Sequence, residues 1–312
     1  MTGLRESARF VFLTRHEDLR SGWKILLFLL CLTAIGFVLV GGAGWIVGGI
    51  PAVAMFLGFV SALAASWILT RFVNKKPLAA IGLWVHPHTA RELGIGLLIG
   101  FLMMTGVFIV QLAAGYVSVT WRGLAWHEAG TTVLFSLFYF ASSAAGEELL
   151  FRGYPFQTLA QGITMLPAIL VMSGLFGVAH MQNPHATVLS TINVMLAGIW
   201  LSLAYLKTRG LWLPFGLHLS WNFAQTTVFG FPTSGFGFAE HRLWAAVQNG
   251  PEGITGGAFG PEGGVLATLA LLGGTWYILK SKYLSAPDGI VTLDSVEDVL
   301  PPLSPSIAET ET

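Results

Sequence analysis

The chain has 312 residues, of which 54% are hydrophobic and 10% charged, and its formal net charge at pH 7 is zero. A soluble domain carries roughly 25% charged residues, so this composition, with a mean hydropathy of +0.69, excludes an ordinary soluble protein. The balanced charge, without a basic patch or stripe, excludes nucleic acid as a main partner.

The apolar residues fall in blocks that are long enough to cross a bilayer as helices. In chain order we expect about eight transmembrane helices, at residues 24–49, 50–71, 93–115, 131–153, 164–181, 186–206, 211–229 and 264–280. The predicted fold is all-α and polytopic, with a short segment 1–23 before a membrane domain of residues 24–283. Residues 284–312 are acidic and contain prolines, which predicts a disordered tail.

The positive charges predict an orientation in the membrane. All sixteen Lys and Arg residues except Arg122 and Arg242 fall on one side of the predicted helices. The positive-inside rule assigns that side to the cytoplasm, so that both termini are cytoplasmic. The external loop 230–263 is rich in glycine, a composition that favours a flexible connection over a lid. Gly96 and Gly100 are expected to let two helices approach closely.

Few ionisable residues lie inside or beside the predicted spans, and no aspartate does, which excludes an aspartyl protease. A zinc HExxH motif is absent, because His127–Glu128 is followed by Ala-Gly-Thr. A charge at the middle of a membrane helix costs about 2.5–3.5 kcal/mol and therefore marks a functional candidate, with a buried ion pair as the structural alternative. The candidates are Glu147, Glu148, Arg152, His180, His185 and His218.

Spacing separates the two adjacent glutamates. Glu148 and Arg152 are four residues apart and share one helical face, in the orientation that favours an ion pair. Glu147 points about 100° away from Glu148 and has no partner on its own helix. A carboxylate that depends on other helices for its partners is a candidate general base.

Two later helices offer partners for Glu147. His180 ends the segment LFGVAH, and His218 shares a helical face with Asn222, four residues later. A lone histidine in an apolar helix is usually a packing residue, but this set supplies what hydrolysis requires: a base, a second proton-handling group and oxyanion donors. His185 is expected to be a turn residue. A serine nucleophile stays open as an alternative, with Ser142, Ser143 or Ser220 as candidates.

In this order the residues resemble the CAAX prenyl protease and bacteriocin-processing (CPBP, or Abi) family of intramembrane proteases. The motif EExxxR is met by Glu147, Glu148 and Arg152, FxxxH by Phe176 and His180, and HxxxN by His218 and Asn222. The likeness covers residues 131–226 and implies a helical, Rce1-like core with a cavity open towards the cytoplasm. It implies an endopeptidase that hydrolyses a peptide bond in a membrane-associated substrate, in some relatives a prenylated CaaX protein.

The resemblance also implies roles for the motif residues. Glu147 would be the general base, His180 would hold the water, and His218 and Asn222 would donate to the oxyanion. Glu148 and Arg152 would be the supporting pair. We favour a mechanism without a metal, although Glu147, His180 and His218 could together bind zinc.

Other functions stay open at this point. The alternatives are a non-catalytic scaffold or bacteriocin-immunity protein of the same fold and, more weakly, a solute transporter. We expect an integral protein of a prokaryotic cell membrane whose partners are the bilayer and a membrane-associated peptide or protein substrate.

The span limits contain one conflict. They place His180 near the external end of its helix and Arg152 near the cytoplasmic end of the preceding helix, which keeps Glu147 away from His180. Either a break around Pro184 that lines a wet cavity, or continuation of the Glu147 helix to about Thr158, would bring the two together.

Overall fold

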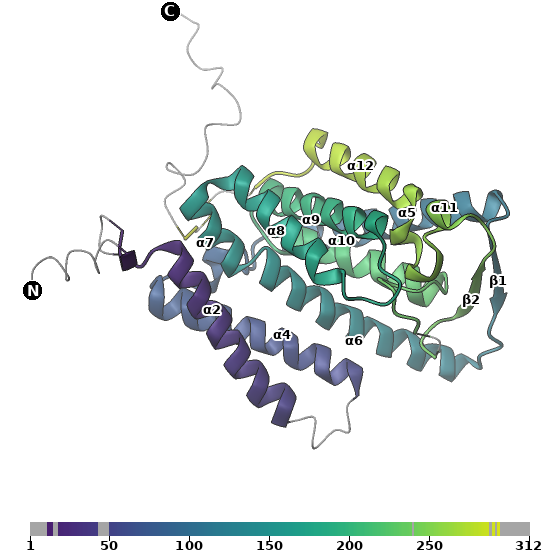
Figure 1. Ribbon diagram of the computed structural model, residues 1–312, viewed down its shortest axis with the longest axis horizontal. Coiled ribbons are helices and arrows are strands. Elements are labelled where there is room, and N and C mark those ends of the chain that lie inside the picture. The colour runs from purple at the N-terminus through teal and green to yellow at the C-terminus, as the bar shows by residue number, and fades with distance from the viewer. Residues whose placement is uncertain are drawn as a thin grey trace, which may run out of the picture.

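The computed structural model describes residues 11–14, 18–42, 50–238, 240–286, 289–290 and 292–293, and most of them are helical (Figure 1). The α-helices are α2 (Ser21–Gly36), α4 (Pro51–Ile68), α5 (Thr89–Ala113), α6 (Trp126–Phe151), α7 (Tyr154–Ile163), α8 (Met165–His180), α9 (Val188–Thr208), α10 (Trp212–Phe223), α11 (Glu252–Thr255) and α12 (Val265–Lys280). One-turn π-helices extend α2 over Phe37–Gly41, α4 over Leu69–Val73 and α10 over Ala224–Val228.

The all-α membrane fold is confirmed, whereas the count of eight spans is not. In the described part of the chain, five helical segments are long and apolar enough to cross a membrane: Ser21–Gly41, Pro51–Val73, Thr89–Ala113, Trp126–Ile163 and Val188–Thr208. Met165–His180 and Val265–Lys280 are apolar but shorter. The end of the first predicted span, residues 43–49, and most of the predicted terminal segments 1–23 and 284–312 lie outside the described residues.

Helix α10 lies at the centre of the bundle and packs most closely against α5. Glycines make this approach possible, because a Cβ at Gly96 or Gly100 would overlap the carbonyl oxygen of Leu213 or Leu217. Gly216 of α10 faces α5 in the same way. The predicted role of Gly96 and Gly100 in helix contact is therefore confirmed.

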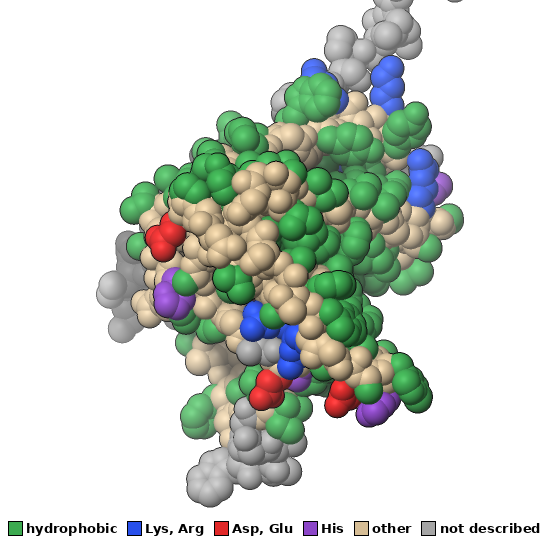
Figure 2. All heavy atoms as spheres, turned by 90° about the vertical axis from the view of Figure 1, so that its right-hand side faces the viewer, with side chains coloured by type: hydrophobic (Ala, Val, Ile, Leu, Met, Phe, Trp, Pro, Cys, Tyr) green, Lys and Arg blue, Asp and Glu red, His purple; other side chains and the backbone are tan. Residues whose placement is uncertain are grey.

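Two strands that the sequence reading did not predict form a ribbon at one end of the molecule (Figure 1). Strand β1 (Val117–Trp121) follows α5, and β2 (Trp244–Gln248) follows α10; they pair antiparallel from Val117 opposite Gln248 to Trp121 opposite Trp244. Arg122 donates to the carbonyl oxygens of Glu240 and Arg242 beside the ribbon. Figure 2 views this end, where charged side chains are scattered among hydrophobic ones. The two basic residues predicted to be external thus share one end.

The loops predicted to be cytoplasmic meet at the opposite end. The backbone N–H of Leu211 donates to Gly82, 3.0 Å away, and Arg91 donates to the carbonyl oxygen of Tyr283. The relative placement of the loops therefore agrees with the predicted topology, because loops assigned to one side of the membrane contact one another.

Candidate active site

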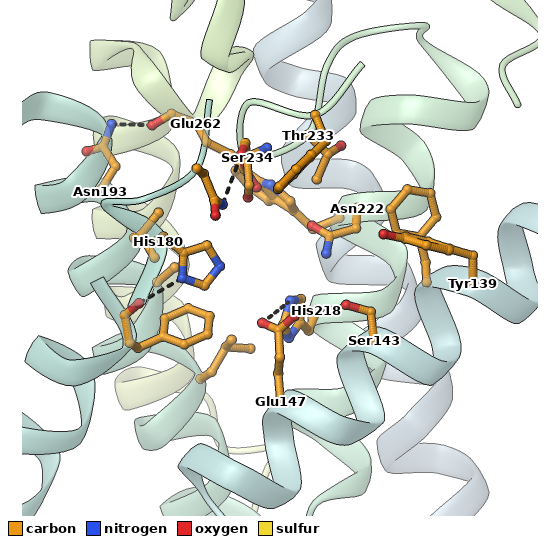
Figure 3. Close-up of a pocket in the computed structure, with 18 of the residues that line it drawn as sticks. Tyr139, Ser143, Glu147, His180, Asn193, His218, Asn222, Thr233, Ser234 and Glu262 are labelled. Carbon is orange, nitrogen blue, oxygen red and sulfur yellow. Dashed lines mark hydrogen bonds and ion pairs between the residues drawn. The ribbon is translucent and has the colours of Figure 1, made fainter. Parts of the chain in front are cut away.

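The six predicted site residues converge on a small region of the bundle. Helices α4, α6, α8, α9 and α10 surround a pocket with a volume of about 520 Å³. Figure 3 shows Glu147, His180, His218 and Asn222 around this pocket. Glu148 and Arg152 lie behind its wall, each with a side chain only 1% exposed.

Arg152 and Glu148 form the predicted ion pair, with 3.1 Å between Nη1 and Oε1. The second guanidinium nitrogen donates to the carbonyl oxygen of Gly198 on α9. The guanidinium also lies over the ring of Phe176, 4.8 Å from its centroid. Arg152 therefore joins α6, α8 and α9 at one point, and it spares Glu148 from being an unpaired buried charge.

Glu148 has a second partner that its spacing did not predict. Nδ1 of His218 lies 2.9 Å from Glu148 Oε1. Because a carboxylate oxygen is an acceptor, the proton of this hydrogen bond belongs to Nδ1. The bond fixes the imidazole ring and directs Nε2 towards Glu147 and the pocket.

Glu147 occupies the position between the fixed network and the pocket. Ser143, one turn earlier on α6, donates its hydroxyl to Glu147 Oε1 at 2.9 Å. Glu147 Oε2 lies 3.8 Å from His218 Nε2, too far for a direct hydrogen bond. One carboxylate oxygen is thus held in place, while the other is buried beside His218 without a hydrogen-bond partner among the described residues.

His180 is oriented by its own helix. Its Nδ1 lies 2.7 Å from the carbonyl oxygen of Phe176, an acceptor, so Nδ1 carries the proton and Nε2 is left as an acceptor. Asn222, on the helical face of His218, also lines the pocket. The ring of Phe176 lies 4.7 Å from His180 and 6.2 Å from His218 between ring centroids, which explains why an aromatic residue stands at this position.

The conflict over the depth of His180 is resolved, because His180 and Glu147 line the same pocket. The chain breaks after α6 and continues as α7 to Ile163, further than the expected limit near Thr158. The ten residues of α7 extend up to about 15 Å, and the sixteen residues of α8 rise about 24 Å. Because α7 carries the chain further from the ribbon end before α8 begins, the end of α8 brings His180 back to the depth of Glu147. The turn around Pro184 is exposed and contributes only Asn183 to the pocket, and His185 has the positive φ of a turn residue.

Residues 230–264, which we call the roof, cover the pocket at the ribbon end. Thr233, Ser234, Phe236, Phe238 and Glu262 from this segment line the pocket. The roof is packed closely: a Cβ at Gly235, whose φ is 86°, would overlap the carbonyl oxygen of Pro184, and the N–H of Gly235 donates to Phe259. The glycines therefore serve close backbone contact rather than the flexible connection that the composition favoured.

The positions of the residues that line the pocket can be compared with the cytoplasmic opening that the resemblance implied. Part of the lining comes from the first turns of α4, the last turns of α8 and the roof, at the ribbon end, whereas Glu147 lies near the other end of α6. The pocket therefore extends from the ribbon end into the middle of the bundle, and the cytoplasmic opening that the resemblance implied stays a prediction.

The donor set was also tested for a metal site. In the part of the chain that the structure describes, no group of three or more His, Cys, Asp or Glu side chains could hold a metal ion. Glu147 and His218 lie 3.8 Å apart, but His180 does not complete a set of three metal ligands with them. The described geometry does not fit the three-residue zinc set.

Comparison with known proteins agrees with this geometry. Residues 129–224 match the family model described as "Type II CAAX prenyl endopeptidase Rce1-like". This segment is thus similar to the Rce1-like endopeptidases. The match confirms the resemblance predicted from the motifs, and the matched segment contains all six predicted site residues.

The chain is also 24% identical over 188 residues to the uncharacterized protein YyaK of Bacillus subtilis (strain 168). That alignment covers 55% of this chain and 60% of the relative's length. No solved structure matches the chain significantly.

Sequence reasoning missed several residues of the pocket. Ser143 was considered only as a nucleophile, whereas its hydroxyl donates to Glu147. The spacing of Ser143 from Glu147, four residues on one helical face, was the signal that could have revealed this bond. Glu262 was missed because only the folded roof brings it to the pocket, whereas Asn193 is a buried polar residue of α9 whose spacing links it to none of the candidates.

Proposed function

We propose that the protein is an intramembrane endopeptidase that hydrolyses a peptide bond in a membrane-associated substrate with water activated by Glu147. The observation that carries the proposal is the position of Glu147, which lines the pocket and whose Oε2 lies 3.8 Å from the fixed Nε2 of His218. The match to the Rce1-like endopeptidases, a protease family, supports the same reaction class.

Glu147 is suited to take the proton from water. Ser143 donates one hydrogen bond to Oε1, and Oε2 is buried without a hydrogen-bond partner among the described residues, so the carboxylate keeps the capacity to accept a proton from a bound water molecule. His180 Nε2 is left as an acceptor by the bond of Nδ1 to Phe176. It accepts a hydrogen bond from the second hydrogen of that water, which stays on the oxygen. The water oxygen is then directed at the substrate carbonyl carbon, to which it adds.

The oxyanion that forms needs donors on the other side of the carbonyl. Asn222 supplies its amide N–H, and His218 supplies Nε2–H when its ring is protonated. Protonated His218 balances the local charge, because Arg152 and His218 are then matched by Glu147 and Glu148. The proton held by Glu147 goes to the leaving amine nitrogen when the peptide C–N bond breaks.

The substrate class follows from the position and the lining of the pocket. A peptide or protein tail that lies at the membrane, of which a lipidated CaaX-type tail is one case, has access to a pocket among transmembrane helices. The largely apolar and aromatic lining favours such a chain over a polar solute. We propose that the protein works in a prokaryotic cell membrane without a metal.

The test is cleavage of a panel of lipidated and unmodified peptides by the full chain in nanodiscs. We expect mass spectrometry in ¹⁸O-water to find one labelled oxygen in the new carboxyl terminus of a cleaved peptide. Absence of cleavage by the wild type, together with a cellular phenotype that survives Glu147→Gln, would instead favour the scaffold or immunity function.

A further inference from the structure

The roof brings a second carboxylate, Glu262, to the pocket, across from Glu147 in Figure 3. Its backbone is fixed by α9, since the Asn193 side chain donates to the carbonyl oxygens of Glu262 and Gly264 at 2.8 and 3.0 Å. Thr268 of α12 in turn donates to Asn193 Oδ1 at 2.7 Å. The main chain of Glu262 is therefore held without any help from its side chain.

The side chain uses only one of its two oxygens to hold the roof. The backbone N–H and the hydroxyl of Ser234 both donate to Glu262 Oε2, at 2.7 and 2.9 Å. Oε1 makes no hydrogen bond with the residues that the structure describes. A carboxylate oxygen is a strong acceptor, so Glu262 keeps free capacity at a position that lines the pocket.

Glu262 also lacks a counter-ion, in contrast to the other carboxylates of the site. Glu148 pairs with Arg152, and both Glu147 and Glu148 lie beside His218. Among the described residues Glu262 forms no ion pair, and neither Lys nor Arg is found among those that line the pocket. The pocket therefore carries an uncompensated negative charge under the roof.

Aromatic rings form much of the remaining wall. Tyr139, Trp200, Trp221, Phe236 and Phe238 line the pocket together with Glu262. The faces of aromatic rings attract ammonium and guanidinium groups, most strongly where the cation has lost water. A half-buried carboxylate in a pocket lined by such rings suits a cation and repels an anion.

We propose that Glu262 is a specificity-determining residue that binds a lysine or arginine side chain of the substrate peptide. The proposal rests on the proposed peptidase function and names the substrate feature that the roof selects. By the same charge argument, a substrate residue with a carboxylate at this position is disfavoured.

The experiment compares cleavage by wild type and Glu262→Gln, both as full chains in nanodiscs. Quenched fluorescent decapeptides carry Lys, norleucine or Glu at each position in turn. We expect wild type to prefer Lys over norleucine at one position by about tenfold in kcat/KM, the size of a hydrogen bond to a charged group. Glu262→Gln keeps an oxygen for Ser234, so the roof stays in place, but the preference falls to within about twofold.

The matched control is Glu252→Gln, which removes the same charge from an exposed position of the same roof. This variant should keep the wild-type preference. Charge reversal by Glu262→Lys should transfer the preference to Glu at the same peptide position. Two results would overturn the inference and leave the peptidase function standing. One is a wild type without any preference for Lys. The other is a Glu262→Gln variant whose kcat/KM falls by the same factor for all peptides.

A binding measurement separates the two proposals if the wild type cleaves nothing. Fluorescence anisotropy of dansylated Lys and norleucine peptides reports the Kd for each protein. Tighter binding of the Lys peptide to wild type, lost in Glu262→Gln, would retain the cation site and refute the peptidase function. Equal binding of the two peptides to wild type would refute the cation site as well.

Discussion

Arg152 offers the sharpest test of how the site is held together. Its guanidinium is 1% exposed, bonds to Glu148 and Gly198, and lies over Phe176. Arg152→Met keeps the length and apolar stem of the side chain but leaves the buried Glu148 with His218 as its remaining partner. Breaking a buried pair from one side costs about 3–5 kcal/mol, because the remaining charge loses its fixed counter-ion.

The assay is reversible unfolding of the full chain by SDS in mixed micelles. We expect Arg152→Met to lower the free energy of unfolding by about 3–5 kcal/mol, and Glu148→Gln combined with Arg152→Met to recover more than half of that loss. Arg91→Met, on an exposed arginine, is the control and should change stability by about 0.5 kcal/mol or less. A loss below about 1 kcal/mol for Arg152→Met, or strict additivity in the double variant, would refute the reasoning.

Three further predictions concern helix contact, the roof and the base. Gly100→Ala should lower stability by more than about 2 kcal/mol, because its Cβ overlaps Leu217 of α10, whereas Gly106→Ala has open space and should be neutral; equal midpoints in SDS titrations would contradict this. Burial lowers the pKa of His241 below its usual 6.5, so the unfolded state binds the proton more readily and stability falls as pH drops below 6.5. His241→Phe should flatten part of that decrease in unfolding midpoints between pH 7.5 and 5, and an unchanged slope would refute it. Ser143→Ala should reduce kcat about tenfold with little change in KM, because the base loses a fixed orientation; an unchanged kcat would count against that role.

Much of the site was predictable because it is encoded in local spacing. The pair of Glu148 and Arg152 follows from a separation of four residues on a helix and is present at 3.1 Å. Long apolar blocks predicted most described helix limits to within a few residues, because a helix satisfies its backbone hydrogen bonds internally in a bilayer. The close approach at Gly96 and Gly100 followed from residue size alone.

Other features depend on tertiary contacts that spacing cannot reveal. The bond between Glu148 and His218 joins positions 70 residues apart. Helix α7 sets the depth of His180. The break between α6 and α7, from Phe151 to Tyr154, is not visible in the hydropathy of the sequence. Glycine content cannot tell a slack loop from a tightly packed one, so the roof and the position of Glu262 emerged only from the structure.

The central claim is that Glu147 activates water. Its most direct test is kcat/KM for wild type, Glu147→Gln and the loop variant Glu128→Gln on one cleaved peptide, measured from pH 4 to 8. We predict a loss of at least about 100-fold for Glu147→Gln, the usual contribution of a general base, with Glu128→Gln unchanged. We also predict a wild-type rate that falls at acid pH, because a general base acts only in its deprotonated form. Undiminished cleavage by Glu147→Gln, or a wild-type rate independent of pH over this range, would contradict the claim.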